Sequence, residues 1–200
     1  IVTGDWSSDV CSSDLGNPKG VVYHHRGAYL NAMGNSLEWD MKMHPTYLWT
    51  LPMFHCNGWC FPWTIAMRAG TNICLRKITG ENIYDKIFSH GVEYLCGAPT
   101  VLSFIINTDS NHVKKLNGRV KLMTAAAPPP AKILEQIEKC GFDVTHVYGL
   151  TEVYGPAVIC KWKDQWDNLE PAEKANLKSR QGVSYLVQED LKVVNSETRK

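Results

Sequence analysis

The sequence lacks a surplus of either charge, a long apolar run and a basic leader. Lys and Arg number 21 and Asp and Glu number 20, so the net charge is +1 with histidine neutral. This balance argues against a polybasic surface for nucleic acid or membrane, and against an acidic tail. No apolar run approaches the roughly 20 residues of a spanning helix, and no basic and apolar leader opens the chain. We therefore expect a cytoplasmic protein with no transmembrane segment and no nucleic-acid partner.

Cysteine is present, but its seven residues follow no regular spacing. Most stand among apolar neighbours, as Cys74 and Cys96 do, which predicts buried, reduced thiols. The spacing of Cys56 and Cys60 beside His55 is one that zinc tolerates, but no second Cys/His pair accompanies them. The pattern therefore favours reduced thiols in a cytosolic protein over a metal centre.

Short apolar runs typical of buried strands alternate with stretches of helical spacing. This alternation predicts βαβ units and an α/β fold with a mostly parallel sheet and flanking helices. At 200 residues and 44% apolar content, the chain can bury one core. The expected strands are 47–51, 71–76, 92–96, 120–124, 144–148 and 183–194. The expected helices are 24–38, one around 65–67, 83–88, 101–106, 131–140 and one in the charged stretch 161–180.

The beginning of the chain differs from the rest. Residues 5–15 read DWSSDVCSSDL, which resembles one reading frame of a common sequencing-adapter oligonucleotide. The alternative is an ordinary loop rich in serine and aspartate. We expect residues 1–15 to be artefactual and residues 16–200 to be a partial domain.

Three clusters carry residues suited to chemistry. Residues 16–20 (GNPKG) combine glycines with a lysine that can offset phosphate charge, although alone they also fit a basic turn. In residues 51–59 (LPMFHCNGW), His55 follows a strand end, where it is placed either to contact a substrate carboxylate or to serve as a core histidine. In residues 148–152 (YGLTE), Tyr148 offers a flat face, Thr151 a hydroxyl and Glu152 a hard oxygen ligand for Mg²⁺. Open α/β sheets bind ligands at such carboxyl strand ends.

Together and in this order, the clusters resemble the adenylate-forming enzyme superfamily, specifically its acyl-CoA synthetases. Residues 16–20 resemble the end of the family's phosphate loop, and residues 52–55 a motif whose histidine lies beside the acyl carboxylate. Residues 97–100 resemble the helix start lining the acyl pocket, and residues 125–128 the turn beside adenine. The resemblance runs from Gly16 to about Val194 and implies the central part of the large N-terminal domain. The nearest branch holds medium-chain acyl-CoA synthetases, plant-type acyl-activating enzymes and methylmercaptopropionate–CoA ligases.

The resemblance implies a two-step reaction with ATP, Mg²⁺ and CoA. A short or medium carboxylic acid attacks the α-phosphate of MgATP, and CoA thiolate then displaces AMP from the acyl-adenylate. The residues assigned to catalysis are His55, Thr151, Glu152 and Lys19, with Glu152 also holding the metal. Those assigned to the nucleotide are Tyr148, Gly149, Ala126, Ala127, Gly16 and Gly20. Those assigned to the acyl group are His55, Trp59, Gly97, Ala98 and Pro99.

The chain departs from the family upstream of Gly16, where a run of hydroxyl residues and glycines is expected. Asp14 would place a carboxylate beside triphosphate, and like charges ~4 Å apart repel by about 4 kcal/mol at an effective dielectric of 20. The family's ribose-binding aspartate and its adenylation lysine would follow Lys200. We therefore expect the chain as given to be inactive. Two alternatives to an acyl-CoA ligase stay open: an adenylating enzyme that transfers the acyl group to another acceptor, and an inactive fragment that only binds nucleotide.

Overall fold

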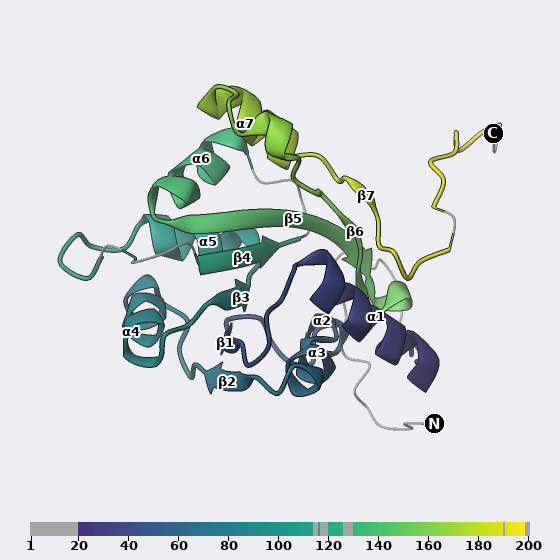
Figure 1. The fold of residues 1–200 in the computed structure, drawn as a ribbon, viewed down its shortest axis with the longest axis horizontal. Helices are drawn as coiled ribbons and strands as arrows, with labels where there is room; N and C mark the ends of the chain where they lie inside the picture. The colour runs from purple at the N-terminus through teal and green to yellow at the C-terminus, as the bar shows by residue number, and fades with distance from the viewer. Residues whose placement is uncertain (1–19, 114–115, 117–119, 126–129, 190, 199–200) are drawn as a thin grey trace.

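The computed structural model describes residues 20–113, 116, 120–125, 130–189 and 191–198 (Figure 1). Within them one seven-stranded sheet has the order β2-β1-β3-β4-β5-β6-β7. The pairs among β1 to β5 are parallel, and β6 and β7 run antiparallel to their neighbours. The expected α/β fold with a mostly parallel sheet is confirmed. The strands are Thr46–Trp49 (β1), Thr71–Cys74 (β2), Tyr94–Cys96 (β3), Val120–Thr124 (β4), Phe142–Leu150 (β5), Gly155–Ile159 (β6) and Val183–Ser184 (β7).

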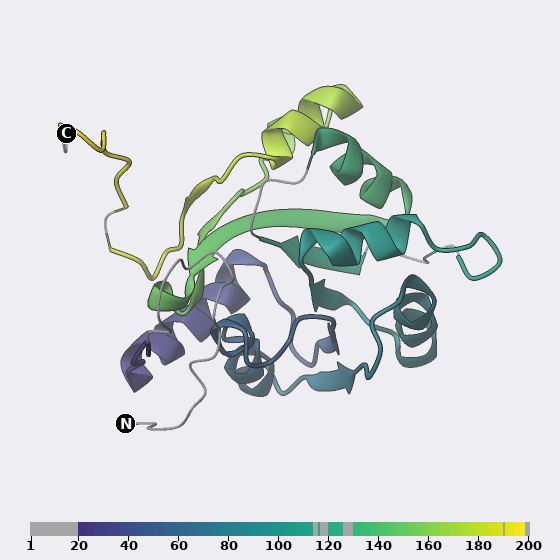
Figure 2. The same ribbon diagram turned by 180° about the vertical axis from the view of Figure 1, so that it is seen from behind.

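Helices cover both faces of the sheet. Figures 1 and 2 show α4 to α7 on one face, and α1, α2 and α3 on the other. The α-helices are His25–Glu38 (α1), Cys56–Trp59 (α2), Phe61–Met67 (α3), Gly80–His90 (α4), Pro99–Ile106 (α5), Ala131–Lys139 (α6) and Pro171–Lys178 (α7). Two 3₁₀ turns are Thr151–Val153 (η1) and Asp164–Trp166 (η2).

Alternating side chains of the strands form two separate cores. Leu48, Leu95 and Leu122 are fully buried against α4, α5 and α6. Their neighbours along the strands, such as Tyr47 and Met123, face the other way and belong to a second core built around aromatic rings. Because successive strand residues point to opposite faces, the central strands β1 and β3 are buried on both faces, whereas the edge strand β2 is mostly exposed.

Local sequence signals set several helix ends. The Thr79 hydroxyl accepts a hydrogen bond from Asn82 N at 3.3 Å and begins α4, and Gly91 ends it with a φ of +62°. Pro99 and Pro171 stand in the first turns of α5 and α7, where a missing N–H costs little. Gly141, which follows α6, has a φ of +93°, a positive value that glycine adopts without strain.

The sequence-based boundaries are wrong at the carboxyl end of the chain. The strand expected over 183–194 is limited to Val183–Ser184, although Tyr185 N still donates to the Ala157 carbonyl of β6 at 2.9 Å. The helix expected in 161–180 is limited to α7, because Pro171 starts it and η2 precedes it. Strand β6 was not expected at all, since its Gly155–Pro156 start is typical of a turn.

The six cysteines in the described part carry no disulfide, as expected. Four of them are buried, whereas Cys74 is exposed because β2 is an edge strand. The described residues hold no group of three His, Cys, Asp or Glu side chains suited to a metal, so the zinc alternative has no support in this part of the chain. None of the described helices combines the length and apolar character of a membrane span.

Candidate functional site

The motif segments share one edge of the sheet. Strands β1, β3, β4 and β5 are adjacent and parallel, and Trp49, Cys96 and Met123 pair in one row. The segments that follow these strands are residues 52–55 after β1, 97–99 after β3, Ala125 after β4 and 151–152 after β5. Ligands bind at the carboxyl ends of strands in open α/β sheets. Parallel pairing therefore brings segments far apart in sequence to one place.

Hydrogen bonds lock the first strand ends together. The Thr50 hydroxyl donates to the Cys96 carbonyl at 2.5 Å, and Gly97 N donates to the Met123 carbonyl at 2.9 Å. A Cβ on Gly97 would lie 2.8 Å from Val101 Cβ, so the turn into α5 requires glycine. Next to it, Ala98 is exposed and Pro99 half-buried.

The end of β5 is shaped by its close approach to β6. The register between the strands shifts between Tyr148 and Gly149. A Cβ on Gly149 would lie only 1.7 Å from the Gly155 carbonyl oxygen, so no other residue fits without separating the strands. Tyr148 is 39% exposed, which leaves its ring available to a flat ligand.

The η1 turn then presents the polar residues of the motif. Thr151 is half-buried and Glu152 is exposed. Tyr154 ends the turn in the left-handed region with a φ of +69°. A carboxylate at the surface of a strand-end turn suits a hard cation such as Mg²⁺, which prefers one or two carboxylates together with substrate phosphates.

The histidine motif ends in a left-handed turn. Residues 56–60 all have φ values between +41° and +63°. Four of them carry side chains, and left-handed helical backbone costs roughly 1–2 kcal/mol per such residue, or on the order of 4–8 kcal/mol in total. Strain of this kind persists only where the surroundings hold it, and it clusters at functional sites.

The left-handed turn contacts η1 directly. Cys56 Sγ lies 3.4 Å from Thr151 Oγ1, and the Cys60 thiol donates to the Tyr154 carbonyl at 3.3 Å. Burial raises the pKa of Cys60 to about 12, which keeps it protonated as a donor. The segment of His55 and the segment of Thr151 and Glu152 therefore lie side by side.

The predicted acyl-site residues His55 and Trp59 differ in how deeply they are buried. His55 is half-buried at the start of the turn. Trp59 is only 6% exposed and lies in the aromatic core with Phe61, while Asn35 Nδ2 donates to its carbonyl at 2.7 Å. The assigned roles of His55 in holding a carboxylate and of Trp59 in an acyl tunnel stay predictions.

Tyr23 is a site residue that sequence reasoning missed. Its hydroxyl donates to the Thr151 carbonyl at 2.5 Å, and its ring lies 4.3 Å from that of Tyr154. The sequence feature that could have indicated Tyr23 is its position three residues after Gly20, at the end of the expected phosphate loop. Asn31 was also missed; its Nδ2 donates to the Pro156 carbonyl at 2.8 Å.

Part of the predicted nucleotide site lies outside the described residues, namely Gly16, Lys19, Ala126 and Ala127. Gly20 is described and exposed, with no atom within 4 Å of an added Cβ. Ala125, which precedes the expected adenine turn, is half-buried.

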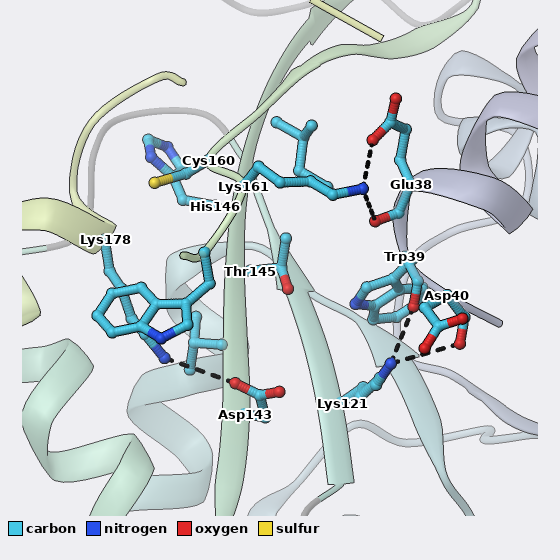
Figure 3. Close-up of a pocket in the computed structure, with 13 residues that line it drawn as sticks. Glu38, Trp39, Asp40, Lys121, Asp143, Thr145, His146, Cys160, Lys161 and Lys178 are labelled. Atoms are coloured by element: carbon cyan, nitrogen blue, oxygen red, sulfur yellow. Dashed lines mark hydrogen bonds and ion pairs between the residues drawn. The ribbon is translucent and has the colours of Figure 1, made fainter. Parts of the chain in front are cut away.

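A cavity of about 170 Å³ lies beside the first half of β5 (Figure 3). Two of its lysines are paired with carboxylates, Lys161 with Glu38 at 2.8 Å and Lys178 with Asp143 at 3.5 Å, and Lys121 donates to the Trp39 carbonyl at 3.0 Å. Its volume is below the roughly 300–1,000 Å³ of typical small-molecule sites. No motif residue lines it, so this cavity is not the candidate site.

Comparison with known proteins identifies the family of the chain. A family model described as "AMP-binding enzyme" matches residues 15–200. The chain is 48% identical over 94% of its length to the peroxisomal acetate/butyrate–CoA ligase AAE7 of Arabidopsis thaliana. It is 43% identical over 99% of its length to the peroxisomal trans-cinnamate:CoA ligase of Petunia hybrida.

Among solved structures, the N-terminal domain of FACL13 from Mycobacterium tuberculosis has the same fold. The TM-score is 0.72 at 22% identity, covering 86% of this chain and 41% of that chain. The chain spans about a third of the two curated relatives, 33% and 35% of their lengths. Both relatives are peroxisomal, so the expectation of a cytoplasmic protein is wrong.

Proposed function

The chain belongs to the AMP-binding enzyme family, as the match over residues 15–200 establishes, and on that premise we propose that it is part of an acyl-CoA ligase. The resemblance to adenylate-forming acyl-CoA synthetases is thereby confirmed. The activity proposed for the whole protein is the MgATP-dependent conversion of a carboxylic acid to an acyl-adenylate, followed by transfer to CoA.

The observation that carries the proposal is the contact between the left-handed turn and η1. Cys56 Sγ lies 3.4 Å from Thr151 Oγ1, and Cys56 directly follows His55. The residue proposed to hold the acid therefore stands beside the residues proposed to hold phosphate and metal. A reaction between a carboxylate and an α-phosphate needs that proximity, because most of its catalysis is positioning and charge stabilisation.

In the first step, a carboxylate oxygen of the acid bonds to the α-phosphorus while the bond from that phosphorus to the pyrophosphate oxygen breaks. His55 orients the carboxylate, and the Thr151 hydroxyl donates to an α-phosphate oxygen. Tyr148 stacks on the adenine. Glu152 would hold Mg²⁺, which offsets triphosphate charge when bound. In the second step, the CoA thiolate attacks the acyl carbonyl and AMP leaves.

We propose a short-chain acid as substrate and a peroxisomal location. Relatives are named for acetate and butyrate, for 2-methylpropanoate and for benzoate. The aromatic side chains around the left-handed turn, with Trp59 and Phe61 buried beside it, support a small acyl group. Fluorescent fusions of the full-length protein, imaged with a peroxisomal marker, test the location.

We also propose that residues 1–15 are not part of the natural protein and that residues 16–200 are a partial adenylation domain. The family match starts at residue 15, which supports this division. The natural phosphate loop would then carry hydroxyl residues and glycines in place of residues such as Asp14. Sequencing the gene across the first codons decides whether residues 1–15 belong to the natural protein or are artefactual.

The test of function uses the full-length enzyme with its natural phosphate loop. Pyrophosphate release and acyl-CoA formation are measured with a panel of acids from acetate to octanoate and benzoate, with Glu152→Gln as the control. We expect acid-dependent release of both products with a short acid. Absence of adenylation with every acid rejects the proposal, and adenylation without thioester formation indicates a different acceptor.

A further inference from the structure

Thr151 is held at two points, its side-chain oxygen and its carbonyl, which accepts Tyr154 N at 3.2 Å as well as a side chain. Its carbonyl accepts the Tyr23 hydroxyl at 2.5 Å, and its side-chain oxygen lies 3.4 Å from Cys56 Sγ. The first contact fixes the backbone of η1, whereas the second fixes the direction of the hydroxyl. A threonine side chain otherwise chooses among staggered χ1 positions, and only one of them directs its hydroxyl to a given atom.

Cys56 is itself held firmly. It is 6% exposed and stands in the left-handed region with a φ of +41°. Gly58 N donates to the His55 carbonyl at 2.7 Å and closes the turn around it. A shift of the backbone at Cys56 would therefore also displace its neighbour His55.

From this geometry we propose that Cys56 is a positioning residue that orients the Thr151 hydroxyl and couples the acid-binding segment to the phosphate-binding segment. The inference rests on the proposed adenylation reaction, in which Thr151 contacts the α-phosphate. The role proposed for Cys56 requires no contact with a substrate. Cys56 acts through Thr151, and its thiol and the threonine hydroxyl can each serve as the donor.

The same turn provides a matched control in Cys60. Its thiol is fully buried and donates to a backbone carbonyl, that of Tyr154, at 3.3 Å. Replacing Cys60 therefore removes a buried thiol and one hydrogen bond from the turn without removing a partner of the Thr151 hydroxyl.

The experiment measures kcat and KM for acid and for ATP in the full-length enzyme, by pyrophosphate release. Cys56→Ala should lower kcat about five-fold, the loss of one ordinary hydrogen bond. Cys56→Ser, which retains a hydroxyl donor, should stay within about two-fold of the natural enzyme by the same reasoning. In a Thr151→Ala background, Cys56→Ala should cause no further loss of kcat, because the Thr151 hydroxyl that it orients is already absent.

Cys60→Ala should combine multiplicatively with Thr151→Ala, because the two residues share no contact through the hydroxyl. If Cys56→Ala does not fold, Cys56→Gly removes the same thiol while accepting the positive φ. The inference is overturned if the kcat of Cys56→Ala, or of Cys56→Gly in its place, equals that of the natural enzyme. It is also overturned if the loss of kcat in this variant multiplies with the loss caused by Thr151→Ala. If the natural enzyme makes no adenylate with any acid, the proposed function fails instead.

Discussion

Gly149 is the position where the addition of a single methyl group should do the most damage. Its Cβ would lie 1.7 Å from the Gly155 carbonyl oxygen and 2.4 Å from the carbonyl carbon. Both atoms belong to the backbone of β6, so no side chain can rotate away. To reach a normal contact, Gly149→Ala must separate the strands by ~1.5 Å, which breaks backbone hydrogen bonding at this end of the β5–β6 ladder.

The cost follows from two contributions. Overpacking costs about 1–3 kcal/mol, and two lost backbone hydrogen bonds cost about 1 kcal/mol each. The sum of roughly 3–5 kcal/mol should lower the melting temperature by several degrees. Because the ladder also holds η1, adenylation should fall by about 100-fold, the effect of a misplacement near 1 Å.

Thermal unfolding and pyrophosphate release of the full-length enzyme provide the measurements. Gly20→Ala is the control for stability, since an added Cβ there meets nothing within 4 Å. A melting temperature for Gly149→Ala equal to that of Gly20→Ala would refute the steric argument.

The other predictions concern the metal, the left-handed turn and pH. Glu152→Gln should raise the Mg²⁺ concentration required for half-maximal adenylation by about ten-fold or more; an unchanged magnesium titration would contradict the assignment. Gly58→Ala should destabilise the protein by about 1–3 kcal/mol in denaturant unfolding, because its Cβ would lie 2.9 Å from the Trp49 ring at a φ of +60°; an unchanged midpoint would be evidence against this turn. Burial lowers the pKa of His146 below its usual 6.5, so below that pH the unfolded chain binds a proton that the folded chain does not. The free energy of unfolding should therefore be unaffected above pH 6.5 and fall by up to ~1.4 kcal/mol for each pH unit below it. His146→Phe should flatten that slope, and an equal slope in both proteins would exclude His146 as its source.

Part of the parallel sheet could be predicted from sequence because its central strands β1 and β3 are buried on both faces. Leu48 and Leu95 stand in continuous apolar runs that end at proline or glycine, and such runs read as strands without any tertiary information. The helix ends at Gly91 and Gly141 followed from the need for a left-handed residue. Once the strands are parallel, their carboxyl ends must share an edge.

The details of the site could not be predicted because they depend on distant partners. Strand β6 begins with Gly155 and Pro156, and its antiparallel pairing with β5 and β7 makes it a strand. The positive φ values of Cys56, Trp59 and Cys60 are held by tertiary contacts, since only Asn57 and Gly58 of this turn accept such values readily. Tyr23 meets Thr151 across 128 residues of sequence, a pairing that no local pattern indicates.

The most direct test of the central claim is a crystal structure of the full-length protein with an acyl-sulfamoyl adenosine, a stable mimic of the acyl-adenylate. The account predicts the adenine ring against Tyr148, the sulfamoyl group near Thr151 and the acyl group near His55. A ligand bound away from the carboxyl edge of the sheet, for example in the cavity of Figure 3, would contradict it.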